Sequence, residues 1–193
     1  MENKNNTPTS VGIIRREEDA LDNKFFPVVQ RTIETPDGKM REQLIWDRRG
    51  KEFSVLLART ADDIYILVKE PKYGQMRDML TVPAGRIKDG ESPEDAARRE
   101  LLEETGYEVK EVILLKDGVV DFPDKTDGGA HYLFIGTDAQ KSSNPPEQFR
   151  EVVELTRSQM ERVLDDQIDG LELDIAMSLT TVALALRHID KTE

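Results

Sequence analysis

The sequence contains no cysteine, and it has only two histidines and one tryptophan among 193 residues. The lack of cysteine excludes disulfides and thiolate metal sites. No segment approaches the roughly 20 apolar residues that a membrane-spanning helix needs. The first residues, 1–6, are polar and lack the apolar stretch of a signal peptide. These absences predict a cytoplasmic protein without a membrane partner.

The charge balance is strongly acidic, because 39 Asp and Glu residues stand against 27 Lys and Arg residues, a net charge of −12. No cluster of basic residues is strong enough to indicate duplex binding, so DNA is not an expected partner. An anionic small molecule is still a possible substrate if side chains or metal ions supply local positive charge.

Turn signals divide the chain into three parts. Residues 1–22 are rich in Asn, Thr, Ser and charged residues, and we expect them to be flexible. Within 23–50, the turn signal at 36–38 separates two apolar runs and predicts a β-hairpin. The remainder, 51–193, is expected to form one main domain.

This main part mixes strand-like and helix-like segments. Strands are predicted over 53–59, 64–69, 80–82, 109–115, 118–122 and 131–137, with a polar loop over 71–78. Helices are predicted over 92–105, 157–166 and 173–188. The pattern indicates an α/β or α+β layer fold in which helices pack on a mixed sheet.

The helix over 92–105 carries three glutamates, Glu100, Glu103 and Glu104, within about 100° of one another on one face. Two unit charges about 6 Å apart repel by roughly 3 kcal/mol at an effective dielectric of 20. Bound Mg²⁺, which prefers oxygen ligands, would offset this repulsion. Glutamates at this spacing are also common on solvated helix faces, so they do not decide between the two readings alone.

The residues around these glutamates favour the metal site over the solvated helix face. They follow a fixed order that matches every defined position of the Nudix box: Gly85, five residues, Glu91, seven residues, Arg99-Glu100-Leu101, one residue, Glu103-Glu104, one residue, and Gly106-Tyr107. The chain therefore resembles the Nudix hydrolase family.

The resemblance implies an α/β/α sandwich around a mixed sheet, with the N-terminal β-hairpin as an extension. It also implies roles for residues of the box, by their numbers in this chain. The expected metal ligands are Glu100, Glu103, Glu104 and the carbonyl of Ala84. The metal would be Mg²⁺, with Mn²⁺ as the alternative. The residues expected to support the motif are Gly85, Glu91, Arg99 and Gly106, with Glu91 and Arg99 forming an ion pair.

Features outside the box resemble the ADP-ribose pyrophosphatases. Pro83 leads into the box, and Pro123 follows Tyr107 by sixteen residues, as in that subfamily. The N-terminal hairpin, with Arg41, resembles strands that often pair or swap in a homodimer. The resemblance implies a homodimer that hydrolyses ADP-ribose to AMP and ribose 5-phosphate.

The chain also departs from that subfamily. Lys72 stands where an arginine is common, and Thr81 stands where a glutamate often holds a ribose. The loop 124–130 has no glutamate, which leaves Asp127, or Asp124, as the catalytic base beside the box residues Glu103 and Glu104. Expected substrate contacts are Lys72, Arg41 and Trp46, while Phe25 and Tyr73 are further stacking candidates.

Two kinds of alternative stay open. The same enzyme class includes hydrolases of nucleotide sugars, NADH and dinucleoside polyphosphates. A non-catalytic Nudix ligand sensor is a second class, although such domains often lose box glutamates and none is missing here.

Overall fold

The computed structural model describes residues 12–23, 26–120, 123, 125–143, 150–165, 167–168 and 170–192. The chain separates into two compact units. Unit 1 contains Met1–Lys51 and Val120–Gly129, and unit 2 contains Glu52–Val119 and Ala130–Glu193. The segment 120–129, which we expected in the main domain, therefore groups with the N-terminal strands.

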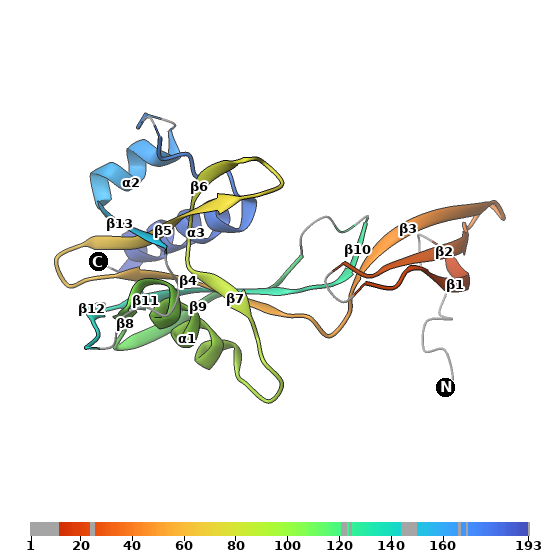
Figure 1. Ribbon diagram of the computed structural model, residues 1–193, viewed down its shortest axis with the longest axis horizontal. Helices are drawn as coiled ribbons and strands as arrows, with labels where there is room; N and C mark the ends of the chain where they lie inside the picture. Colours follow the sequence, from red (N-terminus) through yellow and green to blue (C-terminus); the bar gives the residue numbers. More distant parts are fainter. Residues whose placement is uncertain are drawn as a thin grey trace. The chain divides into compact units, whose positions relative to one another are not determined.

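Unit 1 is a four-stranded sheet. In Figure 1 its first three strands are red to orange and its last strand is teal. Its strands are β1 (Ile13–Leu21), β2 (Val28–Glu34), β3 (Met40–Arg48) and β10 (Thr126–Gly128), in that order. The predicted hairpin is confirmed, since β2 and β3 pair antiparallel across the turn at 36–38. The short strand β10 was not predicted, and it pairs parallel with β3.

The expectation of a flexible segment over residues 1–22 is wrong for its second half. The strand β1 pairs with β2 from Ile13 to Leu21. Its many charged side chains suggested disorder, but two of them meet opposite charges on β2: Arg15 meets Glu34 and Glu17 meets Arg31. Such cross-strand pairs stabilise a sheet that has few apolar residues.

Unit 2 is built on a seven-stranded mixed sheet. Its main strands, in spatial order, are β13 (Glu151–Thr156), β5 (Ile64–Lys72), β4 (Phe53–Arg59), β11 (His131–Thr137) and β9 (Glu111–Val119). The strand β6 (Arg77–Thr81) pairs with β5, and β7 (Ala84–Arg86) pairs with β4. The pair β4–β11 is parallel and the other pairs are antiparallel. A separate small ladder joins β8 (Tyr107–Glu108) and β12 (Gln140–Lys141).

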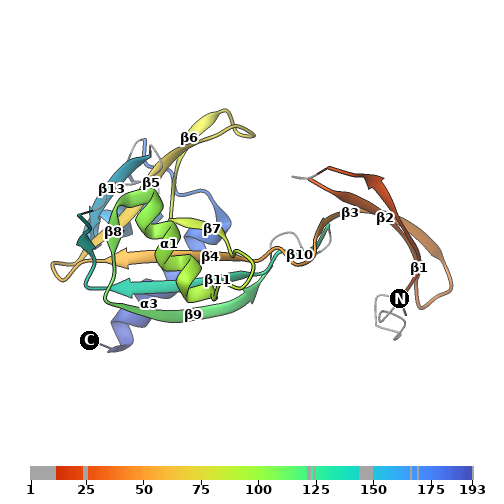
Figure 2. The same ribbon diagram turned by 60° about the horizontal axis from the view of Figure 1, so that its bottom comes forward.

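Helices cover both faces of this sheet. Along β4, Val55 and Leu57 pack in the core that contains α2 (Arg157–Leu164) and α3 (Ala176–Thr192). The alternate residues Leu56 and Ala58 pack in a second core with α1 (Pro93–Thr105). This alternation follows from the two-residue period of a strand. Figure 2 shows α1 in front of the sheet and α3 behind it, which confirms the α/β/α sandwich.

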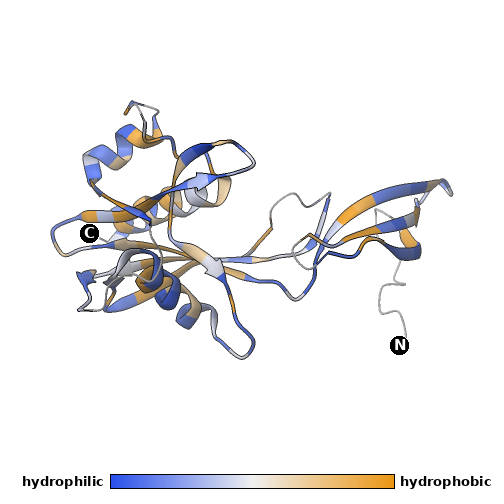
Figure 3. Ribbon diagram, viewed as in Figure 1, coloured by the Kyte–Doolittle hydropathy of each residue, from blue (hydrophilic) through white to orange (hydrophobic). Residues whose placement is uncertain are grey.

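Figure 3 shows the corresponding hydropathy, with hydrophobic residues along the central strands and hydrophilic ones along most of α2. Several boundaries differ from the sequence prediction. The expected loop over 71–78 is the end of a hairpin, since Pro71 pairs with Asp78 and Lys72 with Arg77 and only residues 73–76 form the turn. The two strands expected over 109–122 form mainly one strand, β9, and β13 was not predicted at all. No helix among the described residues has the length and apolar character to cross a membrane.

Candidate active site

The helix α1 is fixed at both ends and along its inner face. The Ser92 hydroxyl accepts a hydrogen bond from the Asp95 N–H at 3.1 Å, and Gly106 ends the helix in the left-handed conformation. The buried Ser54 hydroxyl on β4 donates to the Pro93 carbonyl at 2.7 Å. The small side chains Ala96 and Ala97 lie fully buried against the sheet. These contacts set the position of the carboxylates on the helix.

Gly85 provides the space for one of those carboxylates. It lies on β7, opposite Ser54. A Cβ atom on Gly85 would lie 1.9 Å from the carboxyl carbon of Glu100, well inside van der Waals contact. The glycine is therefore required at this position by the close approach of the Glu100 side chain to the backbone.

Glu104 is almost sealed from solvent, with 1% of its surface exposed. The Ala84 N–H donates to its Oε2 at 3.3 Å, and a guanidinium nitrogen of Arg150 lies 3.1 Å from its Oε1. Burial, together with the carboxylates of Glu70 and Glu100, raises the pKa of Glu104 to about 8 against the opposing effect of Arg150. The site is therefore short of positive charge around Glu104.

Glu91 and Arg99 form a two-point ion pair. Arg99 Nε donates to one Glu91 oxygen at 2.7 Å and Nη2 donates to the other at 2.9 Å, while Nη2 also donates to the Arg86 carbonyl. The hydrogen bonds from Arg99, helped by the Lys88 N–H, lower the pKa of Glu91 to about 2. This pair ties the loop before α1 to the helix.

Arg99 also lies between two other box glutamates. Its Nη1 donates to Glu100 Oε1 at 2.6 Å and lies 3.4 Å from both oxygens of Glu103. Glu103 is the most exposed of the three helix carboxylates, with 20% of its side chain exposed, and Lys88 Nζ lies 3.8 Å from it. Its position leaves it accessible to a solvent molecule.

The donor set fits a hard divalent cation. Among the described residues, no three His, Cys, Asp or Glu side chains surround a common metal position. Instead, the guanidinium groups of Arg99 and Arg150 lie between the carboxylates. The side-chain atoms at the site that could bind a metal are all carboxylate oxygens, which Mg²⁺ and related ions prefer as ligands. The shortage of positive charge around Glu104 favours such an ion.

Several of the predicted site residues belong to unit 1, and they contact other residues of that unit. Asp127 on β10 is paired with Arg31, and its Oδ2 lies 3.7 Å from Arg49 Nε. Trp46 stacks on Phe26 with ring centroids 4.5 Å apart, and the Trp46 Nε1 is buried without a hydrogen-bond partner among the described residues. Phe25 and Asp124 lie outside the described residues.

Of four further residues that the sequence analysis named, two have contacts that the sequence did not indicate and two are exposed. The Lys72 ammonium pairs with Glu70 on its own strand. The buried Thr81 hydroxyl lies 3.0 Å from that of Ser178 on α3, and the Val82 N–H donates to the same serine at 3.1 Å. Tyr73 is exposed at 82% at the tip of the β5–β6 hairpin, whereas Arg41 is exposed on β3 of unit 1.

Glu70 and Arg150 were missed by sequence reasoning. Arg150 contacts both Glu70 and Glu104, so these residues belong to the site. They meet because β13 pairs with β5, where Val152 is opposite Val68. The apolar alternation of 151–156 could have indicated that strand, but no spacing rule could have indicated the contact itself.

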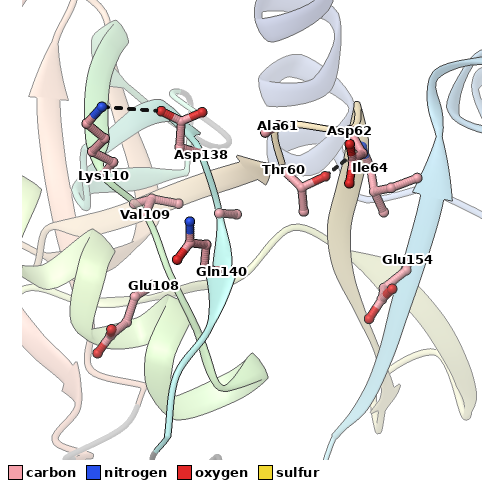
Figure 4. Close-up of a pocket in the computed structure, with 11 residues that line it drawn as sticks. Thr60, Ala61, Asp62, Ile64, Glu108, Val109, Lys110, Asp138, Gln140 and Glu154 are labelled. Carbon is pink, nitrogen blue, oxygen red and sulfur yellow. Dashed lines mark hydrogen bonds and ion pairs between the residues drawn. The ribbon is translucent and has the colours of Figure 1, made fainter.

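A pocket of about 720 Å³ lies elsewhere in unit 2 (Figure 4). It is formed by the turn after β4 and by residues around β8, β11 and β12, and Lys110 and Asp138 form an ion pair at 3.8 Å beside it. None of the predicted site residues lines it. Its lining contains no residue of the Nudix box helix, so we do not assign the hydrolytic site to this pocket.

A family model described as NUDIX domain matches residues 44–172 of the chain. The chain therefore belongs to the Nudix family, and the predicted class of Nudix hydrolase is confirmed. Members of this family generally require a divalent metal ion.

Three proteins are similar to this chain. It is 31% identical to an ADP-sugar pyrophosphatase of Mus musculus over 97% of this chain and 94% of that protein. It is 34% identical to an ADP-ribose pyrophosphatase of Bacillus subtilis (strain 168), over 49% and 50% of the two chains. A solved structure titled "Crystal structure of ADP compounds hydrolase" matches with a TM-score of 0.81 at 21% identity, over 92% of this chain and 94% of that one. The structural match shows the shared fold.

Proposed function

We propose that this protein hydrolyses the diphosphate of ADP-ribose and gives AMP and ribose 5-phosphate, with Mg²⁺ as its cofactor and Mn²⁺ as the alternative. The observation that carries the proposal is the group of carboxylates on α1, held against β7 where Gly85 leaves room for Glu100. The similarity to an ADP-sugar pyrophosphatase and an ADP-ribose pyrophosphatase supports this choice of substrate.

Glu100, Glu103, Glu104 and the Ala84 carbonyl are the proposed metal ligands. A divalent ion bound there supplies positive charge for the diphosphate and lowers the pKa of a coordinated water. Arg99 keeps the Glu100 and Glu103 side chains in place through its pair with Glu91. Glu103, the most accessible of the three, is the proposed acceptor for the proton of the attacking water.

Asp127 is the second proposed base, with a role that depends on its ion pairs. Its carboxylate is bound by Arg31, so it would have to leave that partner, at least in part, to accept a proton. Glu103 makes only longer contacts, at 3.4 Å and 3.8 Å, and therefore serves better in this role.

The residues proposed to contact the substrate are Lys72, Arg41 and Trp46. The half-buried Trp46 ring already stacks on Phe26, which supports a role for this aromatic pair as a platform for a nucleobase. We further propose a cytoplasmic homodimer that binds a small nucleoside-diphosphate compound and no DNA. The acidic net charge of −12 supports the last point.

The second candidate function is hydrolysis of another nucleoside-diphosphate compound, such as a nucleotide sugar, NADH or a dinucleoside polyphosphate. Similarity to a GDP-mannose pyrophosphatase of Klebsiella pneumoniae, 29% identical over 75% of this chain, favours including a nucleotide sugar. A ligand sensor without catalysis would bind ADP-ribose and release no AMP.

A substrate panel tests the proposal. The full chain is incubated with each compound in Mg²⁺ and in Mn²⁺, and the products are separated by chromatography. We expect AMP and ribose 5-phosphate from ADP-ribose at the highest kcat/KM of the panel. Preferred cleavage of another compound would replace the substrate, and tight binding of ADP-ribose without any product would favour the sensor.

A further inference from the structure

Arg150 holds two carboxylates that come from different elements. It lies just before β13, and its guanidinium contacts Glu70 on β5 and Glu104 on α1. The side chain of Arg150 is 22% exposed, that of Glu70 is 15% exposed and that of Glu104 is 1% exposed. The guanidinium is therefore the cation at the most buried carboxylate of the proposed metal site.

Both oxygens of Glu104 are engaged in this arrangement. Oε2 accepts the Ala84 N–H and Oε1 faces Arg150 at 3.1 Å. A divalent ion bound to Glu104 would lie close to the guanidinium, and two cations at such a distance repel strongly where water is scarce. Binding of the ion and the present position of Arg150 are therefore in competition.

Glu70 offers Arg150 a place to remain when Glu104 is taken. It contacts Arg150 through one oxygen and Lys72 through the other, so it is anchored on its own strand. Arg150 is 22% exposed and has five donor hydrogens, so it can keep Glu70 as a partner while it leaves Glu104.

We propose that Arg150 is a displaceable counter-ion of Glu104. It neutralises this carboxylate when no divalent ion is bound, moves onto Glu70 when one binds, and so sets the metal concentration at which the site fills. The inference rests on the proposed function in one respect, that Glu104 is a metal ligand.

The first test measures Mg²⁺ binding to the full chain by titration calorimetry, without nucleotide, at about pH 9.5, where few protons compete for the ligands. Arg150→Gln removes the competing charge, and we expect Mg²⁺ to bind roughly tenfold more tightly than to the wild type. Arg150→Lys keeps a charge that cannot span both carboxylates, and it should give an intermediate affinity. Unchanged or weaker binding by a folded Arg150→Gln variant would overturn the proposal.

Arg157→Gln is the matched control. Arg157 also contacts two carboxylates, Glu161 at 2.8 Å and Asp190 at 2.9 Å, and its side chain is 27% exposed. Neither of these ion pairs includes a box carboxylate, so its replacement should leave the Mg²⁺ affinity unchanged. A gain equal to that of Arg150→Gln would show a general charge effect and would overturn the specific role.

Two further readouts separate competition from a structural role. Glu70→Gln removes the alternative partner, so Arg150 should stay on Glu104 and Mg²⁺ should bind several-fold more weakly. In the wild type, the ¹⁵Nε–H resonance of Arg150 should shift when Mg²⁺ is added, while that of Arg157 stays in place. Saturation with Mg²⁺ without any shift of the Arg150 resonance would contradict displacement.

These measurements need no substrate. If the wild type cleaves ADP-ribose but Arg150→Gln binds Mg²⁺ as the wild type does, the proposed function stands and the counter-ion role fails. If no diphosphate compound is cleaved, the proposed function fails, whereas the Mg²⁺ titrations still decide the role of Arg150.

Discussion

Two arginine–carboxylate clusters flank α1, and the pKa of a glutamate is lowered in one of them and raised in the other. At the N-terminal side, Glu91 receives two hydrogen bonds from Arg99 and one from the Lys88 N–H, and its pKa falls to about 2. At the C-terminal side, Glu104 shares the guanidinium of Arg150 with a second carboxylate, and burial raises its pKa to about 8.

The difference shows what decides the role of a box glutamate. Glu91 is saturated with donors and acts as a fixed charge that holds a loop. Glu104 is buried with too little positive charge around it, so it has a strong tendency to take up a cation, whether a proton or a metal ion. A common residue type thus serves as a brace in one place and as a proposed ligand in the other.

The largest expected effect on catalysis is at the cluster of Glu104 and Arg150. Glu104→Gln should lower kcat for ADP-ribose about 10³-fold, since several kcal/mol of transition-state stabilisation depend on the bound metal. The melting temperature should change little, because Gln has the shape of Glu and Glu104, with a pKa of about 8, is mostly uncharged at neutral pH. Steady-state kinetics and thermal melting measure both. Glu94→Gln, on the exposed first turn of the same helix, is the control, and near-wild-type turnover of Glu104→Gln would remove this cluster from the mechanism.

A smaller loss of activity is expected when the Glu100 side chain is displaced and its charge is kept. In Gly85→Ala the new Cβ would collide with the Glu100 carboxyl, and that flexible side chain must move. We expect kcat/KM to fall roughly 10- to 100-fold with the fold intact, about 1.4–2.7 kcal/mol. Gly74→Ala is the matched control, because a Cβ there meets no atom within 4 Å. Equal activity of the two variants would show that Glu100 tolerates the shift.

A substitution in the cluster of Glu91 and Arg99 should affect the stability of the fold more than the rate of hydrolysis. Glu91→Gln removes the charge of a largely buried pair, and we expect the free energy of unfolding to fall by about 2 kcal/mol. Urea denaturation of the two proteins measures the difference. The contrast between the clusters would break down if Glu91→Gln kept full stability and lost as much activity as Glu104→Gln.

The smallest effect is a pH dependence of that stability difference. The folded pKa of Glu91 is about 2, below its ordinary value of 4.5, so the ion pair contributes fully above 4.5 and is lost as the pH falls towards 2. The stability gap between wild type and Glu91→Gln should therefore narrow over this range. Urea midpoints for both proteins at several pH values between 7 and about 3 measure it, and a constant gap would contradict the assigned pKa shift.

The part of the site that lies within one helix and its flanking loops could be predicted from sequence. The caps at Ser92 and Gly106 and the spacing of the glutamates are local, so they follow from helix geometry. The sandwich itself came from the resemblance, while the structure supplied its direct basis in the alternating residues of β4.

The rest depends on long-range pairing. Glu70 and Arg150 are 80 residues apart and meet through the β5–β13 ladder. The strand β1 was mistaken for a flexible segment because its stabilising partners, such as Arg31 for Glu17, lie on another strand. Composition reports how polar a segment is, whereas the charges opposite it depend on the strand register.

Ser178 makes the chain segment that leads into Gly85 sensitive to substitutions far from the proposed metal ligands. Its single hydroxyl contacts both Thr81 and the Val82 N–H, immediately before Pro83, Ala84 and Gly85. This serine belongs to α3, on the face of the sheet opposite α1, and α3 contains none of the residues proposed for chemistry. A substitution that shifts α3 by a fraction of an ångström would reach the backbone beside Glu100 through this hydroxyl. Damaging variants of this protein should therefore map to both faces of the sheet, including positions that never approach the diphosphate.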